Sequence, residues 1–145
     1  MPTNAPFAAG ALLQYVATLV SGLAGLQQTY IGAPESIASR VSAYVTLGDL
    51  TPSPHATQVA RREPQIVVAF AYRVAGAEQS AELMIADLVD ELTAAVYADR
   101  SLGGTSQNAV LDMSKNVQPA YMAVAGAEFR VYYTVITGLQ TTSTP

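Results

Sequence analysis

Three carboxylates, Asp87, Asp90 and Glu91, form the densest group of side chains that could do chemistry. Their spacings of three and four residues put Asp87 beside the other two on one face of a helix. Carboxylate oxygens suit Mg²⁺ or Ca²⁺, but a helix face lacks the encircling loop of an all-protein calcium site. We therefore favour a solvated helix face. A metal-dependent enzyme, or carboxylates that face a channel or a neighbouring subunit, are the open alternatives.

Other residue types that commonly carry catalysis are sparse. His55 is the only histidine, and no partner for a general base or a metal ligand lies near it in the sequence. The absence of cysteine excludes disulfides, cysteine-based metal sites and thiol catalysis. No glycine-rich phosphate loop precedes a predicted helix, and Gly103 and Gly104 follow one, as a helix stop does. We expect no catalytic residue, metal or cofactor, and hence no enzyme.

The charge balance narrows the class of partner. Seven Lys and Arg residues stand against eleven Asp and Glu residues, so the net charge is −4. A groove that grips nucleic acid needs a basic footprint, and Arg61 with Arg62 is too short for one. Only 12% of the 145 residues are charged, whereas a small soluble domain usually carries about twice that fraction. This scarcity predicts that other copies of the chain cover part of the surface.

The first 34 residues contain no charged side chain, and residues 6–26 are largely apolar. Polar residues interrupt this stretch and no cation precedes it, which argues against a membrane span or a secretory signal. The apolar spacing instead favours an amphipathic helix capped by Asn4. Small residues on its other face allow close approach of an element of the same chain or of another subunit. The apolar stripe comprises Leu12, Val16, Leu19, Leu23 and Leu26.

The remaining pattern predicts one further helix and four strands. The helix is expected at 77–97 and the strands at 36–47, 65–74, 108–113 and 128–139. Loops are expected at 48–55 and 116–126, a loop or hairpin tip at 58–64, and flexible ends at 1–5 and 140–145. These elements predict a single domain over residues 1–145. Its fold class is α+β, with two helices packed on one face of a mainly antiparallel four- to five-stranded sheet, in the order α-β-β-α-β-β.

Three motifs between residues 77 and 139 resemble those of a known family. They are the acidic helix at 81–92, the run Asp-Arg-Ser-Leu-Gly-Gly at 99–104, and Gly-Ala-Glu-Phe-Arg-Val at 126–131. The segment is similar to the tail terminator proteins of long-tailed, siphovirus-type bacteriophages. In that family an Asp-x-Ser/Thr-Leu-Gly-Gly run closes the second helix, and a strand bearing Glu and Arg lies near the C-terminus. The motifs cover about half the chain, and the element order covers most of it.

The resemblance implies a structural protein of the phage virion. Such proteins form a hexameric ring that caps the tail tube, ends its polymerisation and joins the tail to the head connector. The implied partners are other copies of the chain, the tube protein and the connector, with DNA passing through the lumen and no membrane involved. The implied location is the neck or tail of the particle, and the host cytoplasm during assembly. A net-acidic ring would repel the DNA backbone, so DNA could slide without sticking.

Residues of the matched motifs are the candidate structural or subunit-contact positions. They are Asp99, Arg100, Leu102, Gly103 and Gly104 in the turn, and Glu128 and Arg130 in the last strand. The acidic set Asp87, Asp90 and Glu91 is the candidate lumen or contact group. The long segments 53–63 and 114–125 are the candidates for contact with the tube. The alternative function is another head–tail joining or neck protein of related fold; membrane attachment through residues 6–26 is a different class.

Overall fold

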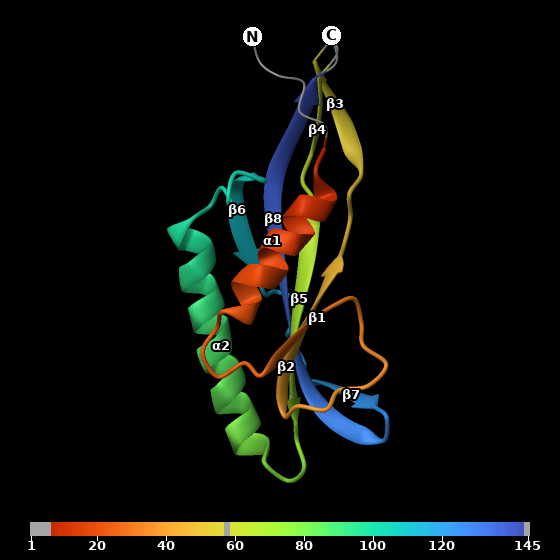
Figure 1. Cartoon of the computed structure of the whole chain (residues 1–145), viewed down its shortest axis with the longest axis vertical. Helices are drawn as coiled ribbons and strands as arrows, with labels where there is room; N and C mark the ends of the chain where they lie inside the picture. Colours follow the sequence, from red (N-terminus) through yellow and green to blue (C-terminus); the bar gives the residue numbers. More distant parts are fainter. Residues whose placement is uncertain (1–6, 57–58, 144–145) are drawn as a thin grey trace.

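Two helices cover one face of a large, strongly twisted sheet (Figure 1). The computed structural model describes residues 7–56 and 59–143. The helices are α1 (Ala9–Ser21) and α2 (Glu78–Ala98). The strands are β1 (Gln28–Ile31), β2 (Val41–Leu47), β3 (Pro52–Ala56), β4 (Val59–Arg62), β5 (Gln65–Arg73), β6 (Gln107–Asp112), β7 (Ala120–Val124) and β8 (Ala127–Ser143). The expected α+β class, with two helices and a mainly antiparallel sheet, is confirmed.

The long strand β8 organises the sheet. β5 and β4 pair with successive stretches of β8. The two pairings follow each other along β8, since Gln65 of β5 lies opposite Thr137 and Arg62 of β4 lies opposite Gln140. β6 and β7 also pair with β8, while β2 pairs with β5 and the hairpin strand β3 pairs with β4. All of these pairings are antiparallel; β1 alone runs parallel to its neighbour, β2. β8 is therefore the scaffold on which most of the other strands depend.

The expected strand number and order were wrong. The described part of the chain forms an eight-stranded sheet, with the order α-β-β-β-β-β-α-β-β-β along the chain. The expected loops at 48–55 and 116–126 contain β3 and β7, and β4 lies within 58–64. β3 contains Pro52 and Pro54, which fit a strand only where their nitrogens face away from β4, at a free edge. Residues 140–143, expected as a flexible end, belong to β8 because β4 gives them a partner.

The first helix is shorter than expected. α1 ends at Ser21, because Gly22 closes its last turn and Gly25 has a positive φ of 83°. Leu12 and Val16 are buried as the spacing predicts, and Leu23 still reaches the core from the connection that follows. The cap expected at Asn4 lies outside the described residues.

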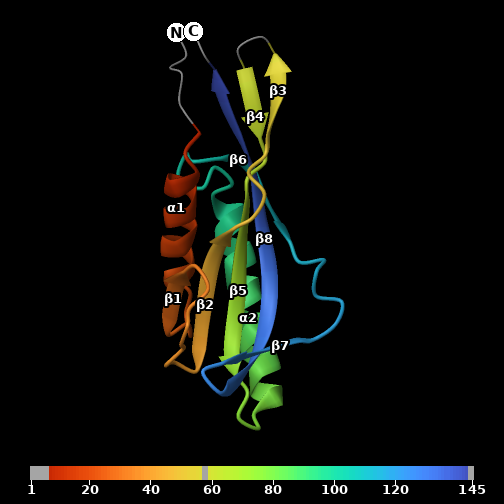
Figure 2. The same cartoon turned by 90° about the vertical axis from the view of Figure 1, so that its right-hand side faces the viewer.

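Apolar side chains fill both faces of the sheet. The main core lies between the helices and the sheet and includes Leu12, Val16, Val20, Val45, Val68, Phe70, Leu88, Leu92 and Ile136. A second cluster lies on the opposite face, where β7 and the connection between β1 and β2 cover the sheet (Figure 2). It includes Ile37, Tyr44, Ala71, Val124, Phe129 and Val131. The alternating side chains of β5 therefore serve two cores, large ones toward the helices and small ones away from them.

The pentapeptide Val-Ala-Gly-Ala-Glu occurs twice, at 74–78 and 124–128. Both copies form a tight turn in which alanine and glycine have positive φ, 40° and 79° at Ala75 and Gly76, and 50° and 83° at Ala125 and Gly126. The second turn joins β7 to β8. Two positive φ values favour Asn-Gly over Ala-Gly, because asparagine tolerates the left-handed region better than alanine does.

Ala125→Asn is therefore expected to raise the free energy of unfolding by about 0.5–1 kcal/mol. A shift of the urea midpoint at unchanged slope would measure it. Ala123→Asn, on the exposed side of the same hairpin, is the matched control and should give no gain. Equal effects of the two substitutions would contradict a backbone origin.

Candidate interaction surfaces

The turn after α2 is built around the carboxylate of Asp99. Its Oδ1 accepts hydrogen bonds from the Ser101 N–H at 3.1 Å and the Ser101 hydroxyl at 2.5 Å. Its Oδ2 accepts from the Gly103 N–H at 2.9 Å and the Tyr15 hydroxyl at 3.1 Å. These donors hold the pKa of Asp99 below its ordinary value of 3.8, with the Ser101 hydroxyl as the largest cause. One carboxylate thus fixes the turn and ties it to α1.

Leu102, Gly103 and Gly104 follow in left-handed backbone conformations, with φ of 47°, 67° and 83°. The Leu102 side chain is buried in the main core. A Cβ added at Gly103 would lie 2.5 Å from the Tyr15 ring, so glycine is needed there for close approach of α1. These three motif residues make contacts within one chain.

Arg100, in the same motif, lies on the surface. Its Nε donates to the Ala109 carbonyl oxygen at 3.0 Å, and its guanidinium lies 5.6 Å from the centre of the Tyr97 ring. These contacts connect the end of α2 to β6.

The structure separates the two motif residues of the last strand. Glu128 is exposed at the start of β8, whereas the side chain of Arg130 is only 7% exposed and faces α2. Arg130 Nε lies 2.6 Å from Glu82 Oε1, and an Arg130 Nη1 hydrogen bond reaches the Val131 carbonyl oxygen. This is the one ion pair within the described ranges. Sequence reasoning missed Glu82, which lies 48 positions from Arg130.

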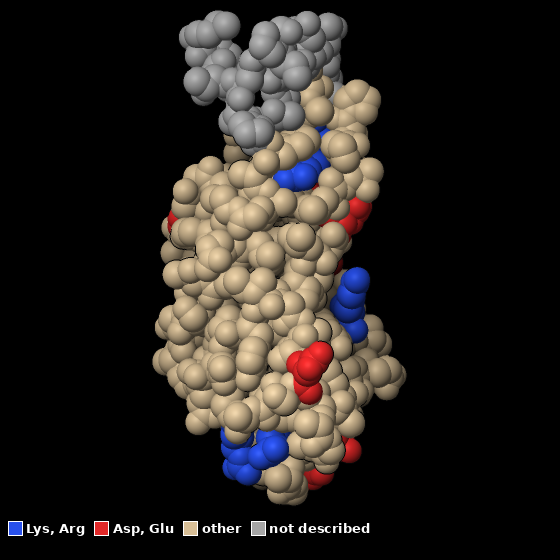
Figure 3. All heavy atoms as spheres, turned by 45° about the vertical axis from the view of Figure 1, so that its right-hand side comes forward, with Lys and Arg blue, Asp and Glu red and all other residues tan. Residues whose placement is uncertain are grey.

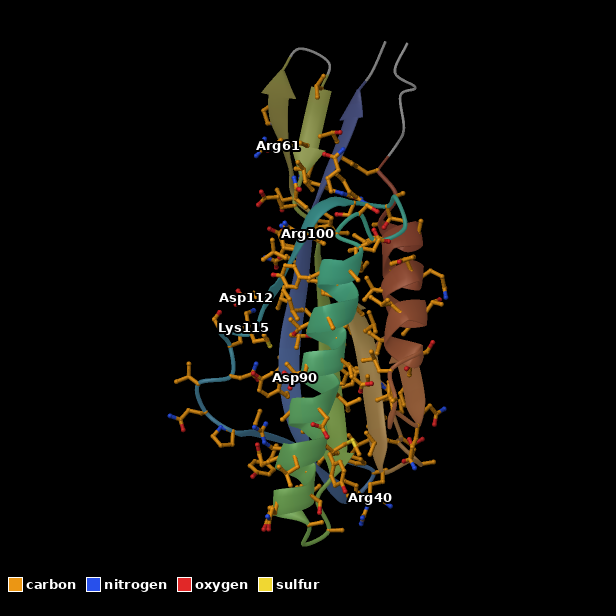
Figure 4. The ribbon with its side chains drawn as sticks, turned by 90° about the vertical axis from the view of Figure 1, so that its left-hand side faces the viewer. Arg40, Arg61, Asp90, Arg100, Asp112 and Lys115 are labelled. Carbon is orange, nitrogen blue, oxygen red and sulfur yellow. The ribbon has the colours of Figure 1, made fainter. Side chains whose placement is uncertain are left out.

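The acidic set on α2 is divided between two environments. Asp87 and Asp90 are exposed, and Asp90 is labelled on α2 in Figure 4. Glu91 Oε1 instead accepts a hydrogen bond from the Ala24 N–H at 3.2 Å and so holds the connection after α1. Residues 7–56 and 59–143 contain no group of three His, Cys, Asp or Glu residues arranged to hold a metal ion. α2 has five carboxylates and no Lys or Arg, so its outer face is acidic.

The exposed face of α1 is uncharged and small. It consists of Gly10, Ala11, Gln14, Thr18 and Ser21. On the side of the molecule that Figure 3 shows, charged residues are few and a broad area carries none. Small, uncharged side chains can be buried by a neighbour without desolvating an ion and with close backbone approach.

The connection between β6 and β7 projects from the side of the molecule opposite α1 (Figures 2 and 4). Asn116 anchors it to β8. The Asn116 amide accepts from the Tyr133 N–H at 3.0 Å and donates to the Tyr133 carbonyl oxygen and, at 3.1 Å, to that of Met113. Because β6 and β7 leave Tyr133 without a strand partner on this edge, the Asn116 side chain takes that place. Val117 follows and is 83% exposed.

Asn116→Ala is expected to lower the free energy of unfolding by about 1–3 kcal/mol, because it leaves two backbone groups of β8 unsatisfied. It should also speed hydrogen exchange of the Tyr133 amide, measured by NMR or mass spectrometry. Gln118→Ala, at an exposed position of the same connection, is the control. If exchange at Tyr133 were equally slow in both variants, Asn116 would not be the anchor.

The two segments expected to contact a tube lie apart. Residues 53–63 fall largely in the β3–β4 hairpin, at the end of the molecule where β8 finishes, and residues 114–125 comprise the side projection and β7 (Figure 2). Neither helix in the described ranges has the length and hydrophobicity needed to cross a membrane. Comparison with protein-family models gives no match, and comparison with curated proteins gives none.

Proposed function

We propose that the chain is a structural protein of a siphovirus-type phage particle that forms a ring on the tail tube. The ring ends polymerisation of the tube and joins the tail to the head connector, leaving a lumen for DNA. In this role the chain has no catalytic function, and it resides in the virion after assembly in the host cytoplasm. The resemblance of the turn at 99–104 and of the strand from 126 to the terminator family motivates the proposal.

The observation that carries the proposal is the charge-free exposed surface of α1. A chain that works alone in water has no evident need to leave a whole helix face, within 34 uncharged residues, without a single ion. Burial of that face against another copy removes small and apolar groups from water at little desolvation cost. A face that contacts a different face of the next copy builds a ring when the rotation closes.

The acidic face of α2 fits the same role. Asp87 and Asp90 are exposed, and α2 offers no cation to a phosphate. Placed toward the lumen, these carboxylates would repel the DNA backbone and keep the passage from binding it. We propose them as lumen-facing residues, while Glu91 holds the connection after α1.

Deletion of the gene from the phage that encodes the chain tests the proposal. The expected result is full heads, together with unattached tails of excessive and variable length, and rescue by the intact gene in trans. Unattached tails of normal length would instead favour the alternative, a head–tail joining or neck protein that does not control tube growth. Normal infectious particles would contradict both.

A further inference from the structure

Two opposite sides of the molecule have complementary features. α1 and β1 lie along one side, and the β6–β7 connection projects from the other (Figures 2 and 4). Two different surfaces on opposite sides are what a head-to-tail contact between identical copies requires.

The projecting side offers one exposed apolar side chain on a segment that is held in place. Val117, in this connection, is 83% exposed, and the hydrogen bonds of Asn116 hold the segment in place before any partner binds. A segment that is already ordered loses less conformational entropy on docking than a free loop does. Lys115 is exposed and is the only charged side chain between residues 113 and 127.

The α1 side offers the matching chemistry. The exposed surface of α1 is small and uncharged, and Ile31 on the edge strand β1 is 54% exposed. Glu35, in the connection after β1, is exposed and is the only charged side chain among the first 39 residues. The two sides thus present exposed ions of opposite sign, Lys115 on the projecting side and Glu35 on the α1 side. Each has an exposed ion of the other sign near it, since Asp112 lies beside Lys115 and Arg40 ends the connection that carries Glu35 (Figure 4). Two copies can therefore pair these charges crosswise.

We infer that the β6–β7 connection of one copy docks against the α1 and β1 side of the next. Val117 packs on the small and apolar residues around Ile31, and Lys115 pairs with Glu35 of the neighbouring copy. Because the two surfaces differ, the contact repeats from copy to copy and closes into a ring or continues as a filament. This contact would be the subunit interface of the proposed ring, so its role in the particle rests on the proposed function.

Site-directed cross-linking tests the contact, since the chain has no cysteine of its own. Val117→Cys and Ile31→Cys variants are mixed and treated with a short bis-maleimide reagent, over the full range of concentrations at which the protein stays in solution. The expected product is a covalent dimer that needs both variants. Leu83→Cys, at a 62% exposed position on α2, replaces Ile31→Cys in the control. Dimers of Val117→Cys with itself, or yields no higher than in the control, would overturn the inference.

Charge reversal tests the same contact without a reagent. Lys115→Glu and Glu35→Lys are each expected to weaken self-association about tenfold, because each places like charges together, and the double variant should recover most of the loss. Sedimentation measures the association. Additive losses in the double variant, or no self-association of the intact protein, would overturn the inference.

The two proposals fail separately. If the mixed cysteine variants cross-link but the protein leaves tube growth unchanged, the contact is right and the function is wrong. If the protein stops tube growth without the cross-link, the function is right and the contact lies elsewhere.

Discussion

Gly103→Ala is expected to lower the free energy of unfolding by about 2–4 kcal/mol. Two costs add. The φ of 67° at Gly103 lies in the left-handed region, where an alanine costs about 1–2 kcal/mol. The new methyl group would also lie 2.5 Å from one ring carbon of Tyr15 and 2.8 Å from another, so α1 has to move or the turn has to distort.

Gly104→Ala separates these costs. Gly104 has a similar φ of 83°, but a Cβ there would meet nothing within 4 Å. In this control the free energy of unfolding should fall only by the cost of the left-handed backbone conformation, about 1–2 kcal/mol. Urea unfolding of both variants measures the difference. Equal losses would mean that the contact between the turn and Tyr15 does not determine how α1 is held.

Glu82→Ala is expected to lower the free energy of unfolding by about 2 kcal/mol, more than Arg130→Met does. Loss of Glu82 leaves a guanidinium whose side chain is 7% exposed with the Val131 carbonyl as its remaining hydrogen-bond partner, and an uncompensated buried charge is costly. The Glu82 side chain is 55% exposed, so water takes over its contacts when Arg130 is replaced by an apolar residue. The exposure of Glu82 is also why the expected cost stays below that of a fully buried pair.

Thermal and urea unfolding of the two variants at neutral pH check this asymmetry. Leu83→Ala, one residue along α2 and exposed, controls for the change in helix propensity. A larger loss for Arg130→Met than for Glu82→Ala would show that packing of the arginine stem, and not its charge, dominates at this site.

The long elements could be predicted from the sequence because their periodicity is local. α2, β5 and β8 lie within one or two residues of their expected starts, and the expected short strand at 108–113 corresponds to β6. β1, β3, β4 and β7 have only four or five residues each, and they form because β8 or a neighbouring strand supplies hydrogen bonds. No local sequence pattern shows that a neighbouring strand will provide these hydrogen bonds. Two prolines and a run of polar residues therefore predicted loops where the structure has short strands.

The candidate surfaces divide in the same way. The turn at 99–104 could be predicted from its own residues, because Asp99 with Gly103 and Gly104 a few positions later is typical of the end of a helix. The partner of Arg130 could not be predicted in this way, because Glu82 lies on α2, far from Arg130 in the sequence. One signal was available: Arg130 shares a face of β8 with Tyr132 and Ile136, which face the helices, and an arginine there needs a carboxylate. The anchoring of Asn116 on Tyr133 depends on the gap between β6 and β7 and has no sequence signature.

Electron microscopy of tail tubes grown from purified tube protein, with and without this protein, distinguishes a terminator from a protein that plays no part in tube growth. We predict that tubes grown with the protein stop short and carry a ring with a central opening at one end. Tubes of unchanged length with bare ends would contradict it.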